Sequence, residues 1–123
     1  MSKIPTIAWF EIPVSDMSRA QNFYETVFDT QIKIQEFEGI LMGWFPLSEN
    51  GPSGSLVKHQ SYIPSQKGSL LYFTSVDINT ELNRVEDAGG TVYQHKTQIS
   101  PEHGYMGVFM DTEGNRIALH SLE

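Results

Sequence analysis

The chain contains no cysteine. It therefore has no disulfide framework, no thiolate nucleophile and no zinc site with cysteine ligands. No apolar run reaches the roughly 18 residues that a membrane-spanning helix requires, and nothing near Lys3 resembles a signal peptide. We expect a cytoplasmic protein that makes no use of a membrane.

Basic residues are also scarce. The chain has eight Lys and Arg residues and 15 Asp and Glu residues, which gives a formal net charge of −7. Binding to the phosphates of a nucleic acid depends on clustered Lys and Arg, whereas the eight here are scattered along the chain. We expect no nucleic-acid partner, and a small-molecule ligand is the remaining default.

The two halves of the chain share a sequence pattern. The segment MGWF at 42–45 recurs as MGVF at 106–109. Each copy is followed by a turn-rich segment and then by a short apolar strand with a late histidine, His59 in the first half and His120 in the second. Such internal similarity indicates a repeated structural unit.

A helical pattern lies upstream of each copy. In the first half, apolar residues recur at helical spacing over 17–28, and Asp16 is the expected N-cap. In the second half the helical pattern covers 78–88, with Asn79 or Thr80 as the expected N-cap. A β-rich run precedes each helix and another strand follows it, so each half predicts a strand, a helix and three more strands.

These elements predict an α+β fold of two tandem βαβββ modules. We expect the modules to form a curved mixed sheet around a cleft, with the helices outside. The chain is expected to be a single domain over 1–123, with module one at about 5–60, a linker at about 61–68 and module two at about 69–122. A concave site between such repeats is where small ligands usually bind.

Three segments carry a family resemblance: the opening WFEIPVSD at 9–16, the helix end VEDAGG at 85–90 and the closing DTEGNRI at 111–117. Together they resemble the vicinal-oxygen-chelate superfamily, the group of glyoxalase I, the bleomycin-resistance proteins and the extradiol dioxygenases. The most similar branch is a bacterial one described as "predicted enzyme related to lactoylglutathione lyase". The resemblance implies a homodimer. In many members of the family, His or Glu side chains from the first and fourth strands of both modules hold a divalent metal.

The chain departs from the family at those metal positions. Matching the motifs residue by residue places the four ligand positions at Trp9, Val57 (or Lys58 if the register slips by one), Leu71 and Ala118. These side chains offer no donor suited to Mg, Ni, Zn or Fe. We therefore expect no metal and no other cofactor, and no glyoxalase I chemistry by the usual route.

Two residues further along each strand, the same face carries Glu11, His59, Phe73 and His120. Glu with two His is the ligand set of a facial triad, so a metal enzyme with the shifted ligands Glu11, His59 and His120 stays open as an alternative. Another alternative needs no metal. A carboxylate beside an imidazole favours the imidazolium, so Glu11 and His120 could serve as acid and base in an isomerase or lyase.

The remaining candidates are expected to line the cleft. Trp9 and Phe73 offer flat aromatic faces to a planar or apolar ligand, and His103 and Tyr105 lie near an expected loop at the cleft mouth. We expect a protein that encloses a small apolar or aromatic molecule between its modules; whether it is also an enzyme stays open. The predicted ligand-binding set is Trp9, Val57, His59, Leu71, Phe73, His103, Tyr105 and Ala118.

Overall fold

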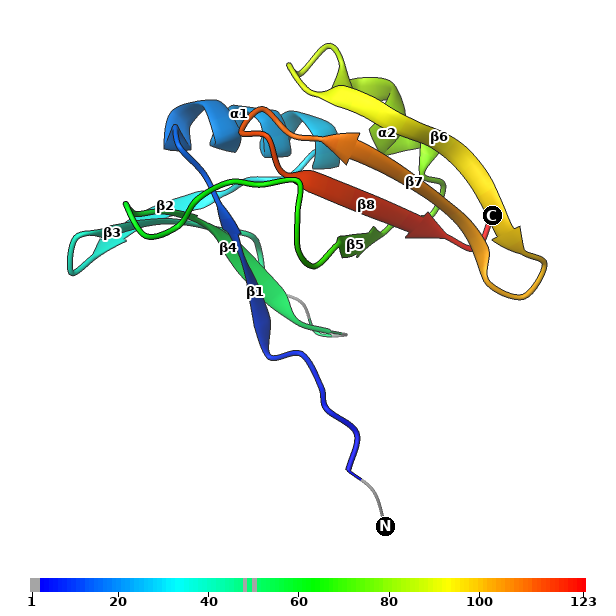
Figure 1. Ribbon diagram of the computed structural model, residues 1–123, viewed down its shortest axis with the longest axis horizontal. Helices are drawn as coiled ribbons and strands as arrows, with labels where there is room; N and C mark the ends of the chain where they lie inside the picture. Colours follow the sequence, from blue (N-terminus) through cyan, green and yellow to red (C-terminus); the bar gives the residue numbers. More distant parts are fainter. Residues whose placement is uncertain (1–2, 48, 50) are drawn as a thin grey trace.

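A computed structural model of the chain describes residues 3–47, 49 and 51–123. Module one contains β1 (Trp9–Pro13), α1 (Met17–Phe28), β2 (Lys33–Phe37), β3 (Ile40–Trp44) and β4 (Ser53–Lys58). Module two contains β5 (Leu71–Thr74), α2 (Asn79–Val85), β6 (Thr91–Ser100), β7 (Gly104–Met110) and β8 (Arg116–Ser121). The predicted α+β fold of two βαβββ modules is confirmed (Figure 1). In the described part of the chain, neither helix has the length and apolar character that a bilayer crossing needs.

Each module builds its own four-stranded sheet. Sheet A has the strand order β1-β4-β3-β2, and sheet B repeats it as β5-β8-β7-β6. The β1–β4 and β5–β8 pairs are parallel and the other pairs are antiparallel, so both sheets are mixed. Among the described strands, no strand of sheet A pairs with a strand of sheet B. The modules therefore form two separate sheets and not the one continuous sheet that the sequence predicted. Figure 1 shows both helices along one side of the two sheets.

Helix α1 lies at the centre of the core. Its apolar residues at helical spacing are all buried: Met17, Ala20, Phe23, Tyr24 and Val27. The carboxylate of Asp16 accepts the backbone N–H of Arg19 at 3.0 Å, which confirms Asp16 as the N-cap. Because Phe23 also contacts Phe109 of β7, with ring centroids 5.8 Å apart, α1 packs against module two as well as its own sheet.

Helix α2 begins earlier than the sequence predicted. Its N-cap is Ile78, and both Asn79 and Thr80 lie inside the helix, so the expected cap at either residue is wrong. The side chain of Ile78 has no exposed surface, and its burial in the core sets where the helix starts. Asp77 supports this turn by accepting the backbone N–H of Asn79 at 3.0 Å.

The hairpin between β7 and β8 ties the two modules together. Asp111 is buried and accepts the hydroxyl of Tyr24 from α1 at 2.6 Å. Asn115 donates its side-chain amide to the carbonyl of Pro13 in β1 at 2.7 Å. Burial, together with the neighbouring Asp111 carboxylate, raises the pKa of Tyr24 well above its usual value. The DTEGN motif that carries the family resemblance therefore joins module two to the start of module one.

Glu113, in the same hairpin, binds the N-terminus of α1. Its carboxylate accepts the backbone N–H groups of Ser15 and Asp16, each at 2.8 Å. It also pairs with the guanidinium of Arg19, whose Nε lies 2.7 Å from Oε2. Burial works to raise the pKa of Glu113, but hydrogen bonds from Arg19, Asp16, Thr112 and Ser15 outweigh it and hold that pKa at about 2.

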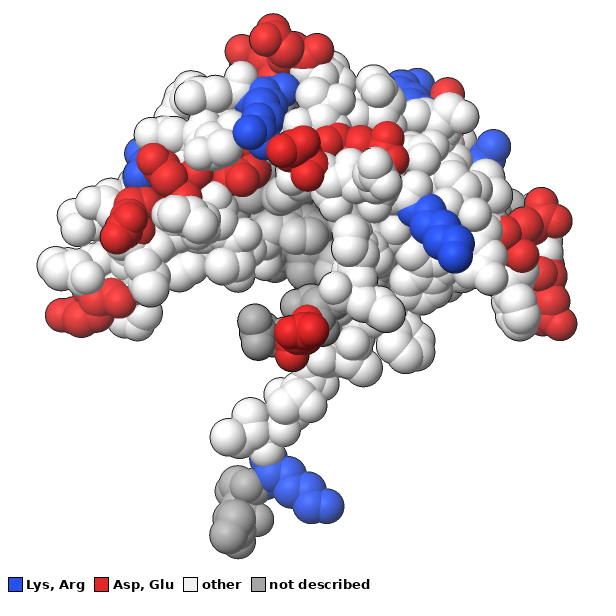
Figure 2. Space-filling view, turned by 180° about the vertical axis from the view of Figure 1, so that it is seen from behind, with Lys and Arg blue, Asp and Glu red and all other residues white. Residues whose placement is uncertain are grey.

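Each sheet has two unlike faces. The helix face packs against α1 and α2 and contributes Ile12 and Leu56 from sheet A, and Leu119 from sheet B, to the core. We call the opposite side the open face. Seen from behind, the molecule is hollowed near its centre, between its two halves (Figure 2).

Candidate functional site

The open face of sheet A carries three of the predicted site residues. In the β1–β4 register Glu11 lies opposite Ser55, and Pro13 lies opposite Val57. Side chains alternate along a strand, and the intervening Ile12 belongs to the core, so Trp9, Glu11 and Val57 share the open face. Trp9 is 61% exposed, whereas Val57 has no exposed surface and forms the floor.

The open face of sheet B carries two more. Tyr72 pairs with Ala118, and Thr74 pairs with His120. Ala118 is fully buried as a floor residue, like Val57, while Tyr72 is 48% exposed.

Leu71 and Phe73 lie on the other side of β5 from the one that the sequence predicted. Both pack against the core cluster on the helix face. A register error of one residue assigns every side chain of a strand to the opposite face. The expected and the observed positions on β5 differ by such an error. The residue that occupies the predicted place is Tyr72.

The repeat itself gives the correct register. Gly43 pairs with Leu56 in module one as Gly107 pairs with Leu119 in module two. On that frame Glu11 is equivalent to Tyr72, and Val57 is equivalent to His120. The sequence contained this signal, because Glu11 precedes Asp16 by the same interval as Tyr72 precedes Asp77.

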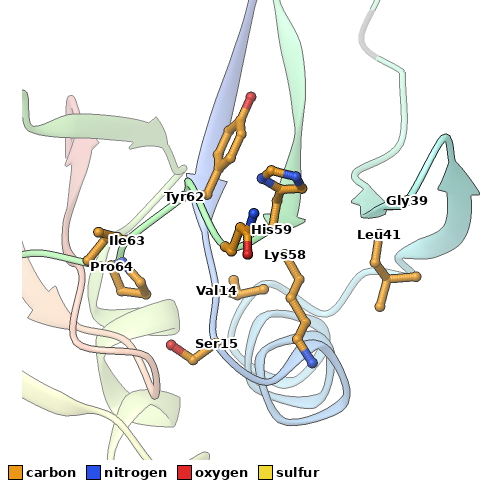
Figure 3. Close-up of a pocket in the computed structure, with 10 residues that line it drawn as sticks. Val14, Ser15, Gly39, Leu41, Lys58, His59, Tyr62, Ile63 and Pro64 are labelled. Atoms are coloured by element: carbon orange, nitrogen blue, oxygen red, sulfur yellow. The ribbon is translucent and has the colours of Figure 1, made fainter.

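Tyr62, a linker residue that the sequence analysis did not identify, contacts both Glu11 and His59. The hydroxyl of Tyr62 donates to Oε1 of Glu11 at 3.1 Å, which raises the pKa of Tyr62. The rings of Tyr62 and His59 lie edge to face with centroids 6.1 Å apart (Figure 3). They border a hollow of about 730 Å³ where the linker leaves β4, and Lys58 and Ser15 also line it.

His120 has a different environment. Its Nε2 lies 2.6 Å from the backbone oxygen of His103, and the ring of His103 contacts Ser100 Oγ at 2.8 Å. The backbone carbonyl of the loop residue His103 therefore lies beside the ring of His120. Glu11 is bonded to Tyr62 instead, so the proposed acid–base pair of Glu11 and His120 does not form in the described chain.

Two further predictions concern metal binding and Tyr105. Within residues 3–47, 49 and 51–123, no three His, Asp or Glu side chains are grouped so that they could hold a metal ion. The shifted triad of Glu11, His59 and His120 is thus not assembled there. Tyr105 packs against the core from the helix face, with the ammonium of Lys96 4.7 Å from its ring centre.

Strands β3 and β7 are apolar on both faces, whereas β8 places Arg116 and His120, and β4 places Ser53 and Ser55, on the open face. A mixed or antiparallel sheet with one solvated face normally alternates apolar and polar residues. Strand β7 instead places Met106, Val108 and Met110 on the open face, opposite residues of β8. In sheet A the open face of β3 carries Met42 and Trp44. Such faces fit apolar contact better than water.

Ser55 is the polar exception on the floor of sheet A. Its side chain is fully buried, and its hydroxyl has no hydrogen-bond partner among the described residues. It lies between Glu11 of β1 and Trp44 of β3 in the pairing register. The buried floor of this face therefore combines the apolar side chain of Val57 with the hydroxyl of Ser55.

Comparison with known proteins gives the same architecture. The model of the family described as "Glyoxalase/Bleomycin resistance protein/Dioxygenase superfamily" matches residues 6–119. TnmS3, an antibiotic binding protein from Streptomyces sp. CB03234, is 22% identical with a TM-score of 0.70, over 98% of both chains. A glyoxalase/bleomycin resistance protein/dioxygenase family enzyme from Burkholderia phytofirmans PsJN is 18% identical with a TM-score of 0.72, over 94% of this chain and 98% of that one. The hypothetical protein SA1046 from S. aureus is 18% identical with a TM-score of 0.68, over 98% of this chain and 95% of that one. No curated protein sequence matches.

Proposed function

Because the chain belongs to the glyoxalase/bleomycin resistance protein/dioxygenase superfamily, we propose that it binds a small apolar or aromatic molecule on the open faces of its sheets. The observation that supports this most is the apolar open face of β3 and β7, together with the exposed rings of Trp9 on β1 and Tyr72 on β5. Exposed apolar area of this kind is typical of binding surfaces. Aromatic side chains supply much contact area at little entropic cost.

Two findings make binding a better account than acid–base catalysis. Glu11 and His120 each have another partner within the chain, as described above. TnmS3, which has the same fold, is itself a binding protein by its description. The assignment to the bacterial branch related to lactoylglutathione lyase remains a prediction and adds nothing to this argument.

The direct test is a titration with N-phenyl-1-naphthylamine, an uncharged aromatic fluorophore whose emission rises in apolar surroundings. We expect its emission to rise and saturate with the native chain. A signal that grows linearly with protein, or that is matched by an unrelated acidic protein, would count against a defined site.

We also propose that the chain forms a homodimer. Strands with apolar side chains on both faces bury most area when a second layer covers them, and a second copy supplies an equally apolar face. Light scattering over a range of concentrations is expected to give twice the mass of the chain. The mass of a single chain at every concentration would refute the dimer and leave the open faces to the ligand alone.

A further inference from the structure

A concave space lies at the end of sheet A, away from the junction of the two modules. We call the space of about 730 Å³ where the linker leaves β4 the rim hollow. Its volume falls within the range of about 300–1,000 Å³ that is typical of ligand sites. Val14 follows β1 and His59 follows β4, and these two strands run parallel. The rim hollow therefore lies at the carboxyl ends of both strands, within module one and the linker.

Lys58 supplies the positive charge of the rim hollow. It pairs with Leu41 in the β3–β4 register, and Leu41 packs against the core. Because side chains alternate along β4 and Val57 lies on the open face, Lys58 extends to the helix side of the sheet. Figure 3 shows the ammonium group of Lys58 and the hydroxyl of Tyr62 pointing in opposite directions. Among the described residues, no carboxylate forms an ion pair with Lys58.

The rim hollow has no acidic lining in a chain that is acidic overall. The net charge of the chain is −7, yet none of the described lining residues is Asp or Glu. The carboxylates at the start of α1 are bound elsewhere: Asp16 accepts from the backbone of Arg19, and Glu113 pairs with the guanidinium of Arg19. A lysine with no carboxylate partner, at a concave surface, attracts an anion.

A turn in the linker adds neutral hydrogen-bonding groups. The backbone N–H of Tyr62 donates to the carbonyl of His59 at 2.9 Å, and that of Ser61 donates to Nδ1 of His59 at 3.1 Å. Since Nδ1 is the acceptor, the neutral imidazole carries its proton on Nε2, which is then a donor. The side chains of Gln60 and Ser15 also line the rim hollow.

We propose that the rim hollow binds the carboxylate of a small organic acid with a short apolar chain. The single ammonium group of Lys58 matches the single charge of a carboxylate. The lining residues Leu41, Ile63 and Pro64 offer apolar contact to the rest of the acid. This inference is independent of the function proposed above, because Lys58 lies on the side of sheet A opposite to Trp9, and either can fail alone.

The test is a ¹⁵N–¹H titration of the full chain with sodium hexanoate at constant ionic strength. We expect the backbone amide signals of residues 58–63 and of Gly39 to shift and saturate. The indole signals of Trp9 and Trp44, which report the open face, should stay unmoved. Hexanamide has the same chain without the charge, and it should shift none of these signals at the same concentrations.

Lys58→Met removes the charge but keeps the apolar stem, and it is expected to weaken hexanoate binding at least about fivefold, which equals about 1 kcal/mol. Lys58→Arg keeps the charge and should retain the affinity. Lys33→Met is the matched control, because Lys33 is an exposed lysine of sheet A that does not line the rim hollow.

Three results would overturn the proposal. They are the absence of saturable shifts at the rim hollow, an unchanged affinity in the Lys58→Met chain, and an equal loss of affinity in the Lys33→Met chain. Movement of the indole signals in place of the amides of 58–63 would likewise assign hexanoate to the open face and refute a site at the rim.

Discussion

Replacing Glu113 by glutamine is expected to lower the free energy of unfolding by about 3 kcal/mol at pH 7. The side chain of Glu113 has no exposed surface, and its two oxygens accept from backbone N–H groups and from the guanidinium of Arg19. A glutamine offers one acceptor oxygen and turns an NH₂ group toward these donors. The fall of the pKa from 4.5 to about 2 supports this magnitude, since one pKa unit equals about 1.4 kcal/mol.

The same substitution is expected to change how stability depends on pH. Because the pKa of Glu113 is lower in the folded chain, its contribution is fully present above about pH 4.5 and is lost as the pH falls toward 2. Denaturant unfolding should therefore show a large difference between the native and Glu113→Gln chains at pH 7 and a much smaller one at pH 3.

Glu102→Gln is the control, because Glu102 is an exposed turn residue of the same type. The Glu102→Gln chain should have the same free energy of unfolding as the native chain at both pH 7 and pH 3. A Glu113→Gln chain that is equally destabilised at pH 7 and pH 3 would show that the charge of Glu113 is not what binds the hairpin to α1.

Replacing Trp9 by alanine is expected to weaken binding of N-phenyl-1-naphthylamine at the open face by at least about tenfold. Trp9 is 61% exposed, so the change removes contact area without opening a cavity in the core. The fluorophore's affinity should be compared in the native and Trp9→Ala chains, with thermal unfolding to confirm that stability is retained.

Glu11→Gln and His120→Asn separate binding from catalysis. Glu11→Gln keeps the shape of the side chain and removes its charge, and His120→Asn keeps a polar side chain but removes the basic imidazole. A binding protein should retain its affinity in both variants. If instead Trp9→Ala binds normally and either polar change abolishes a measured turnover of substrate, the acid–base alternative would replace the present proposal.

The fold was predictable because its signals repeat. The recurring MGWF and MGVF segments sit at equivalent places in β3 and β7, and Asp16 caps α1 as its position implied. Local patterns of this kind report which face of a strand or helix is buried. The separation into two sheets was not predictable, since it depends on how the modules pack rather than on the pattern within each one.

The candidate site was predictable only in part. Trp9 and Glu11 were placed on the correct face, but Leu71 and Phe73 were not, because β5 was matched one residue out of register with β1. The equal intervals from Glu11 to Asp16 and from Tyr72 to Asp77 give the correct register, whereas the match of Trp9 with Leu71 compares unequal intervals to the same two Asp residues. Tyr62 was missed because its contact with Glu11 joins residues far apart in the sequence, through a linker without periodicity.

The central claim is that a small aromatic molecule binds on the open face of sheet A, and the two indole resonances of the chain test it most directly. Trp9 and Trp44 are the chain's two tryptophans, and both lie on that face. In a ¹⁵N–¹H spectrum titrated with N-phenyl-1-naphthylamine, we expect the indole N–H signal of Trp9 to shift and saturate together with the backbone amides of β1 and β4. Saturable binding that leaves both indole signals unmoved would contradict the claim.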